Sequence, residues 1–183
     1  QIEAPHRNRY VFGPQLVQGH TFTVSSRYNL TETGKILGKG SFGLVSSCVD
    51  TKTGAKIAVM RIRPYANDDW DARHTLREVR LMRLLDPHPN IISLYDVSLW
   101  DRKTELYMMI VLMDCDLHNV IHSKQPLSDS HFYCFIKQLL EGVKTMHAMD
   151  IFHRDLKPGN ILVSRDCQLR ITDFGLARYM HSE

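Results

Sequence analysis

The sequence has little of what marks disulfide-rich, membrane-spanning or nucleic-acid-binding proteins. It holds only four cysteines in 183 residues, none with the CxxC spacing of a zinc or redox site, so we expect reduced thiols. The longest apolar run, residues 106–113, has eight residues, whereas a membrane-spanning helix needs about 20. The net charge of +3 comes without dense Lys/Arg blocks, which argues against nucleic-acid and membrane-surface partners.

What the sequence does hold is an ordinary apolar share of 43%, which predicts a packed core. Residues 1–16 mix Pro, Gly and polar residues, and we expect a tail there without a signal peptide. Short strands are predicted over residues 28–37, 44–49 and 55–62, joined by tight turns into an antiparallel meander.

Two helices are predicted from the spacing of apolar residues. Asn67 or Asp68 can cap a helix that runs to about Leu85, and a longer helix starts near Ser128. The expected buried stripes are Leu76, Val79, Met82 and Leu85 in the first helix and Phe132, Phe135/Ile136, Leu139/Leu140, Val143 and Met146 in the second.

Between and after these helices the pattern is again strand-like. Residues 91–97 and 106–112 predict two more strands, and short apolar runs later flank polar clusters. A strand-rich first half followed by a helical second half fits an α+β protein with two lobes, which we expect to divide near residues 113–116.

A glycine cluster closes the first predicted strand, with the pattern Gly38-x-Gly40-x-x-Gly43-x-Val45. Glycines let the backbone approach a phosphate and direct amide N–H groups at its oxygens. A plain glycine-rich hairpin is the alternative. A strand follows the cluster where the dinucleotide-binding fingerprint requires a helix, so that fingerprint is excluded.

A second polar motif, His-Arg-Asp-Leu-Lys-Pro-Gly-Asn at residues 153–160, precedes Asp173-Phe-Gly. Phosphoryl transfer needs a carboxylate at the attacking hydroxyl, cations on the phosphates and oxygen ligands for Mg²⁺. Asp155 can orient the hydroxyl, Lys157 can neutralise the γ-phosphate, and Asn160 and Asp173 supply oxygens. The alternative is a polar loop around a structural histidine, and we favour that supporting role for His153 itself.

With these motifs the chain resembles a eukaryotic protein kinase and, within that superfamily, a mitogen-activated protein kinase. The resemblance covers residues 17–179 and implies a two-lobed fold. A complete N-lobe of antiparallel sheet plus one helix would span residues 17–112, and a partial helical C-lobe residues 113–183. The stretches that carry it include Thr75-Leu-Arg-Glu78, His88-Pro-Asn-Ile-Ile92, Leu112-Met-Asp-Cys-Asp-Leu117 and Asp173-Phe-Gly-Leu-Ala-Arg178.

The resemblance implies ATP and Mg²⁺ as cofactors. It also implies protein substrates with Ser/Thr hydroxyls, an upstream kinase, a monomer, and a place in the cytoplasm or nucleus. Asp155 and Lys157 would be catalytic, and Asn160 and Asp173 would hold the metal. The ATP-binding residues would be Leu37, Gly38, Gly40, Gly43, Val45, Ala58, Met60, Glu78, Ile110, Met113 and Asp116.

One residue departs from that family's pattern. Its strand motif Val-Ala-Ile-Lys is Ile-Ala-Val-Met here, so Met60 stands where the ATP-anchoring lysine would pair with Glu78. Side chains alternate along a strand, so Arg61 is expected to face away and not to substitute. Glu78 would then pair with an arginine of its own helix or face solvent. A natural pseudokinase-like change and an engineered replacement both fit Met60.

The sequence also stops soon after Asp173-Phe-Gly, and we expect the remaining C-lobe of such a kinase to be missing. Three hypotheses stay open: a Ser/Thr kinase of reduced activity, a pseudokinase-like nucleotide-binding or scaffolding protein, and a partial product without independent function.

Overall fold

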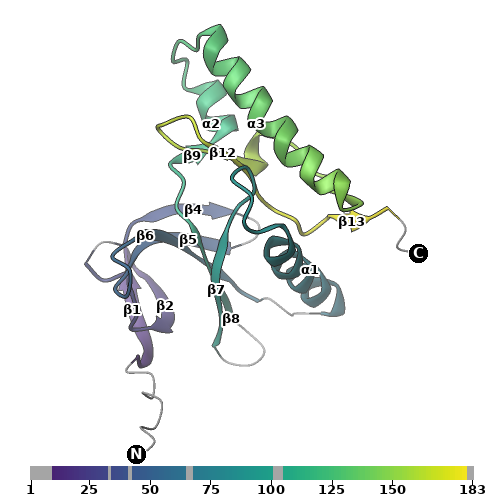
Figure 1. Ribbon diagram of the computed structural model, residues 1–183. Coiled ribbons are helices and arrows are strands. Elements are labelled where there is room, and N and C mark those ends of the chain that lie inside the picture. The colour runs from purple at the N-terminus through teal and green to yellow at the C-terminus, as the bar shows by residue number, and fades with distance from the viewer. Residues whose placement is uncertain (1–9, 33, 41–42, 65–67, 101–104, 181–183) are drawn as a thin grey trace, which may run out of the picture. The chain divides into compact units, whose positions relative to one another are not determined.

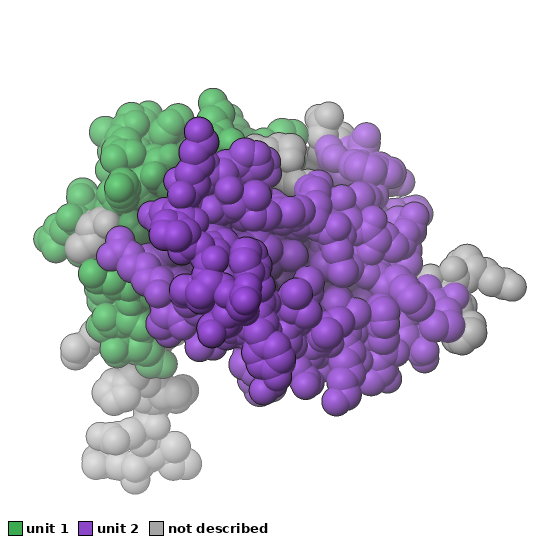
Figure 2. All heavy atoms as spheres, turned by 90° about the horizontal axis from the view of Figure 1, so that it is seen from above, with its two compact units in different colours: residues 1–64, 96–109 green, residues 65–95, 110–183 purple. Residues whose placement is uncertain are grey.

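The computed structural model describes residues 10–32, 34–40, 43–64, 68–100 and 105–180. The chain forms two compact units, residues 1–64 with 96–109 and residues 65–95 with 110–183 (Figure 2). These boundaries differ from the two lobes expected from the sequence, because residues 65–95 belong to the second unit.

The first unit is built on an antiparallel meander, as predicted. Strand order in the larger sheet is β3-β5-β6-β8-β7, and β4 also pairs with β5 (Figure 1). The last residues of β8 and the first of β7 are counted with the second unit. The strands are β3 (Tyr28–Asn29), β4 (Ile36–Gly40), β5 (Gly43–Asp50), β6 (Lys56–Ile62), β7 (Leu94–Trp100) and β8 (Glu105–Val111).

A hairpin precedes this sheet where the sequence favoured a tail up to residue 16. Strands β1 (Phe12–Val17) and β2 (His20–Ser25) pair along their whole length. Gln18 and Gly19 between them both have positive φ, 47° and 82°, as the two central residues of a tight hairpin turn require. Gln15 ties the hairpin to the sheet, because its amide donates to Tyr28 O and accepts from Leu30 N, both at 2.8 Å.

The prediction of one strand over residues 28–37 is wrong. The chain turns after β3, where the Gly34 N–H donates to Leu30 O at 2.8 Å, and β4 starts only at Ile36. A Cβ on Gly34 would lie 2.2 Å from Leu30 O, so this turn depends on glycine. The buried core of the unit lies between hairpin and sheet and includes Phe22, Val24, Tyr28, Leu30, Leu44, Cys48, Ile57, Val59, Tyr107 and Met109.

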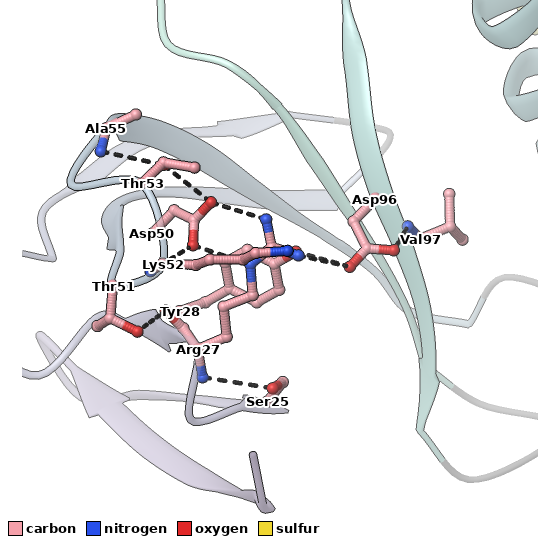
Figure 3. A network of polar contacts seen from close by, with 10 residues as sticks. All are labelled: Ser25, Arg27, Tyr28, Asp50, Thr51, Lys52, Thr53, Ala55, Asp96 and Val97. Carbon is pink, nitrogen blue, oxygen red and sulfur yellow. Dashed lines mark hydrogen bonds and ion pairs between the residues drawn. The ribbon is translucent and has the colours of Figure 1, made fainter. Parts of the chain in front are cut away.

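A network of charged groups crosses the strands of this unit (Figure 3). The Arg27 guanidinium donates twice to Asp50, at 2.8 Å each, and Tyr28 donates its hydroxyl to Asp96 at 2.6 Å. Lys52 N and the Thr53 hydroxyl complete the shell of Asp50, at 3.0 Å each. These bonds link β3, the β5–β6 turn and β7.

The second unit holds the helices. Helix α1 (Asp69–Leu85) starts where the sequence predicted, with the Asp68 carboxylate accepting from Asp71 N at 2.8 Å. Helix α3 (Asp129–Ala148) follows Ser128, also as predicted. The remaining elements are α2 (Leu117–His122), a 3-10 turn (Pro158–Asn160) and β9 (Cys115–Asp116), β10 (Ile151–Phe152), β11 (Ile161–Val163), β12 (Leu169–Ile171) and β13 (Arg178–Tyr179).

Segment 90–93 attaches to β12 and does not begin β7, so the strand predicted over 91–97 starts later, at Leu94. Ile92 N donates to Ile171 O and Ile171 N to Asn90 O, both at 2.9 Å. Helix α3 packs closely on the same place, because a Cβ on Gly142 would lie 2.8 Å from Ile171 Cδ1. β12 therefore joins segment 90–93 to α3 in one framework.

The predicted apolar stripes are only partly buried. Val79, Met82 and Leu85 of α1 are buried, whereas Leu76 is 50% exposed. In α3 only Phe135 and Met146 of the stripe are buried, and Phe132, Ile136 and Leu140 are exposed at 49%, 57% and 60%. The spacing of these residues correctly predicted the helix. Nothing among the described residues, however, covers much of its apolar face.

All four cysteines are free, as expected. No helix among the described residues is both long and apolar enough to cross a membrane.

Candidate functional site

The predicted site residues are divided between the two units. The first unit holds Leu37, Gly38, Gly40, Gly43, Val45, Ala58 and Met60; the second holds Glu78, Ile110, Met113, Asp116, Asp155, Lys157, Asn160 and Asp173.

Three polar residues of the second unit form one hydrogen-bonded group. Lys157 donates to Asp155 Oδ2 at 2.7 Å, and Asn160 Nδ2 donates to the same oxygen and to the Asp155 carbonyl, at 2.9 Å each. The Lys157 bond is the main reason that the pKa of Asp155 lies below its ordinary value, and the Asn160 bond acts in the same direction. Asp155 is therefore a carboxylate at neutral pH, suited to accept a hydrogen bond from an incoming hydroxyl.

His153 supports this group through hydrogen bonds and is itself buried. Its Nε2 lies 2.9 Å from Thr172 O, and its Nδ1 accepts from Asp155 N at 3.3 Å. Burial lowers the pKa of His153. A neutral ring with its proton on Nε2 satisfies both contacts, and so fastens residue 155 to segment 172–174. The expected structural role of His153 is confirmed.

Asp173 is buried, 9% exposed, and adopts a positive φ of 68°. Gly175 N–H donates to its carboxylate, yet Oδ2 has no hydrogen-bond partner among the described residues. Burial raises the pKa of Asp173. An orphaned carboxylate oxygen and the amide oxygen of Asn160, whose Nδ2 is engaged by Asp155, are donors of the kind Mg²⁺ takes. The two residues therefore fit the predicted metal role.

Glu78 lies on α1 and is buried at 7% exposure. None of the ion pairs among the described residues includes it, so both expectations for its side chain, an arginine of its own helix or solvent, are wrong. The preceding Arg77 instead donates to Gly175 O at 2.8 Å. Burial, and then the charge of Asp173, raise the pKa of Glu78 to about 8.

In the first unit the pairing of β5 with β6 places Met60. The register runs without a shift from Val49↔Lys56 to Leu44↔Arg61 and sets Met60 opposite Val45. Cross-strand partners share a face, so Val45, Ala58 and Met60 lie together, and Arg61 lies on the other face. There its guanidinium stands over the Phe22 ring, 5.3 Å from the centroid, and donates to Thr21 O. Arg61 therefore does not replace the missing lysine, as predicted.

The glycines of the cluster have different structural demands. Gly43 has a φ of 140°, and a Cβ there would lie 2.0 Å from Arg61 O, so the packing of β5 on β6 requires this glycine. A Cβ on Gly38 would meet nothing within 4 Å. Leu37 sits at the irregularity between Ile36 and Gly38 and is 44% exposed. Gly40 pairs with Gly43, and residues 41–42 lie outside the described part of the chain.

The remaining predicted ATP-binding residues lie at the end of β8 and just after it, where the chain enters the second unit. Ile110 is buried and Met113 half-buried. The Asp116 carboxylate caps α2, accepting from Asn119 N at 2.7 Å and from Asn119 Nδ2 at 2.9 Å. A role of Asp116 toward a ribose would have to share this cap and stays a prediction.

Comparison with known proteins identifies the family. The protein kinase domain matches residues 31–183. The chain belongs to the protein kinase family. It is 41% identical to mitogen-activated protein kinase 8 of Arabidopsis thaliana, over 97% of this chain and 31% of that protein. It is 40% identical to mitogen-activated protein kinase 6 of Oryza sativa, over 94% of this chain and 46% of that protein.

A fungal relative, mitogen-activated protein kinase mpkA of Aspergillus fumigatus, is 43% identical over 86% of this chain and 37% of its own length. The kinase chain thus spans less than half the length of these relatives. They agree with the resemblance stated from the motifs alone. Protein kinases in general use ATP and a divalent metal, in keeping with the donor set at Asn160 and Asp173.

Sequence reasoning missed one feature of this kinase unit. Burial, and then the positive charges of Arg178 and Arg154, lower the pKa of Arg77, so the guanidinium groups of these two residues lie near that of Arg77. Arg77 lies in α1, Arg154 in the loop that follows β10, and Arg178 in β13. No local spacing in the sequence links the three. Such a cluster is stabilised by an anionic group.

Proposed function

We propose that this chain carries the nucleotide-binding and catalytic-loop regions of a Ser/Thr protein kinase of the mitogen-activated type. It would transfer the γ-phosphate of Mg·ATP to Ser/Thr hydroxyls of proteins within a signalling cascade. The observation that carries the proposal is the Asp155–Lys157–Asn160 group, joined through His153 to the segment of Asp173. A lysine two residues after the catalytic aspartate is similar to the Ser/Thr kinases.

Each residue has a role that follows from its contacts. Asp155, kept ionised by Lys157, would orient the substrate hydroxyl, and Lys157 would neutralise the transferring phosphoryl group. Asn160 and Asp173 would hold Mg²⁺, which supplies charge neutralisation of the phosphates when bound. Protein substrates and an upstream kinase are the proposed partners, with a monomer acting in the cytoplasm or nucleus.

Nucleotide contacts are proposed for both units. From the first, Gly38, Gly40, Gly43 and Val45 would cover ATP, and Ala58 would line the adenine pocket. From the second, Ile110 and the backbone at Met113 would contact adenine. Met60 supplies neither charge nor N–H donor, and loss of one such electrostatic contact costs about 10²-fold in rate.

A second function, a pseudokinase that binds nucleotide or scaffolds a partner, is favoured by Met60 itself. Met60 shares a face with Val45 and Ala58, and Arg61 is committed to Thr21 and Phe22 on the other face. No neighbouring residue on β6 therefore restores the positive charge.

The deciding experiment compares the unsubstituted chain with Met60→Lys and, as a matched control, Met60→Leu. Mg·ATP affinity is measured by calorimetry on the chain, and phosphotransfer on the product of the complete gene. We expect binding by all three, and turnover about 10²-fold higher in Met60→Lys alone. Binding by none would sink the nucleotide site. Binding without turnover in any variant would establish the pseudokinase.

A further inference from the structure

Two buried carboxylates of the second unit form no ion pair among the described residues. Glu78 is 7% exposed and Asp173 is 9% exposed. Asp173 Oδ2 has no hydrogen-bond partner among the described residues, and none of the ion pairs found there includes Glu78. Burying a carboxylate is unfavourable unless it is paired, protonated or bound to a metal.

Contacts between α1 and segment 173–175 bring the two groups into one place. Arg77 donates to Gly175 O at 2.8 Å, and a Cβ on Gly175 would lie 3.5 Å from Asp173 Oδ1 and 4.0 Å from His74 Cδ2. His74 and Glu78 are four residues apart and therefore share a face of α1. The charge of Asp173 also acts on Glu78, since it contributes to the raised pKa of that carboxyl.

We propose that Glu78 is a metal ligand in this protein, holding one divalent cation together with Asp173. Magnesium sites of proteins commonly have one or two carboxylates, with water and phosphate oxygens completing the shell. The described residues contain no cluster of three His, Cys, Asp or Glu side chains that could hold a metal, so the pair relies on such added oxygens. A divalent cation would neutralise both buried charges at once.

The family that the chain resembles has a lysine at position 60 as the usual partner of this glutamate, and the sequence has Met there. The inference takes from the proposed function only the assignment of Asp173 as a metal residue. The competing explanation is a proton on Glu78, which would satisfy the same burial without any metal.

The test measures Mn²⁺ binding to the chain without nucleotide, by the electron paramagnetic resonance signal of free Mn²⁺. It is run at neutral pH, where a bound cation must displace any proton held by Glu78. Variants are Glu78→Gln, Asp173→Asn and, as the matched control, Glu141→Gln, whose carboxylate is 51% exposed beside Lys144. Residues that only hydrogen-bond to a metal ligand already contribute about 10–100-fold to metal affinity. We therefore expect Mn²⁺ binding to be at least about tenfold weaker in the first two variants and unchanged in the control.

The outcomes separate the two explanations. Mn²⁺ affinity that is unchanged in Glu78→Gln, or absent from the unsubstituted chain, overturns the proposal and leaves the proton on Glu78. Circular dichroism without metal confirms that each variant folds. If Glu78→Gln does not fold, Glu78→Asp replaces it in the test. The aspartate side chain is one methylene group shorter, so this variant should bind Mn²⁺ more weakly. Equal affinity overturns the proposal. Failure of the kinase proposal would appear separately, as absent ATP binding.

Discussion

Lys157 donates to Asp155 Oδ2 at 2.7 Å, although 53% of its own side chain is exposed. The pair sets the protonation of the candidate catalytic carboxylate, because this bond is the largest cause of the lowered pKa of Asp155. Both residues were predicted from one short motif, yet their mutual contact is a property of how the loop folds.

Replacing Lys157 by Met should raise the pKa of Asp155 toward that of an ordinary aspartate, since the loop then loses the cation that favours the ionised form. A ¹³C NMR titration of the aspartate carboxyls measures the change. Lys144→Met, which removes an exposed lysine 3.8 Å from Glu141, is the matched control and should leave Asp155 unaltered. An unchanged Asp155 titration in Lys157→Met would contradict the assignment.

Acid should remove the contribution of Asp50 to stability. Arg27 holds the pKa of Asp50 down at about 2, against 3.8 for an unperturbed group. Because the folded-state pKa is the lower one, the stabilisation is complete above about pH 4 and disappears as the pH falls toward 2. Asp50→Asn should therefore cost about 2 kcal/mol in urea unfolding at neutral pH and far less near pH 2. A cost that does not vary with pH would show that the charge is unimportant.

Two glycines of the same cluster should respond differently to alanine. Gly43→Ala places a Cβ against Arg61 O at a φ of 140°, and we expect a loss of about 1–3 kcal/mol in the free energy of unfolding. Gly38→Ala meets open space and should leave unfolding nearly unchanged, while weakening Mg·ATP binding if the backbone there approaches a phosphate. Thermal unfolding and calorimetry read the two effects, and equal destabilisation by both would refute the distinction.

The exposed apolar face of α3 should make the chain self-associate. Phe132, Tyr133, Ile136 and Leu140 are 49%, 71%, 57% and 60% exposed. Ile136→Glu should reduce light scattering at high concentration and change stability by no more than about 0.5 kcal/mol. Phe135→Ala, at a buried neighbour, should instead cost about 3–5 kcal/mol. Undiminished scattering in Ile136→Glu would mean that association uses another surface.

Much of the local structure was predictable from neighbouring residues. The caps at Asp68 and Ser128 correctly predicted where both long helices start. The alternation of side chains along the strands correctly predicted that Arg61 and Met60 lie on opposite faces of the sheet. These features depend on residues close in sequence, and their physical causes act over one or two turns or strand pairs.

Other features could not be predicted correctly, because contacts with distant parts of the chain determine them. The β1–β2 hairpin depends on Gln15, Thr23 and Tyr107; the Tyr107 hydroxyl accepts from Thr23 N at 2.9 Å across 84 residues. Segment 90–93 does not form the predicted strand because its backbone groups hydrogen-bond to Ile171. The arginines at 77, 154 and 178 come together only when their three elements pack in the second unit.

The sequence by itself determined the family and the chemical types at the candidate site, since motifs such as residues 153–160 need particular side chains at particular spacings. Only the tertiary structure decided the state of those side chains. Burial took Glu78 out of solvent and left Asp173 Oδ2 without a partner, because the surroundings of a carboxylate come from whichever elements pack on it. Desolvation and pairing are properties of that packing, and no run of residues encodes them locally.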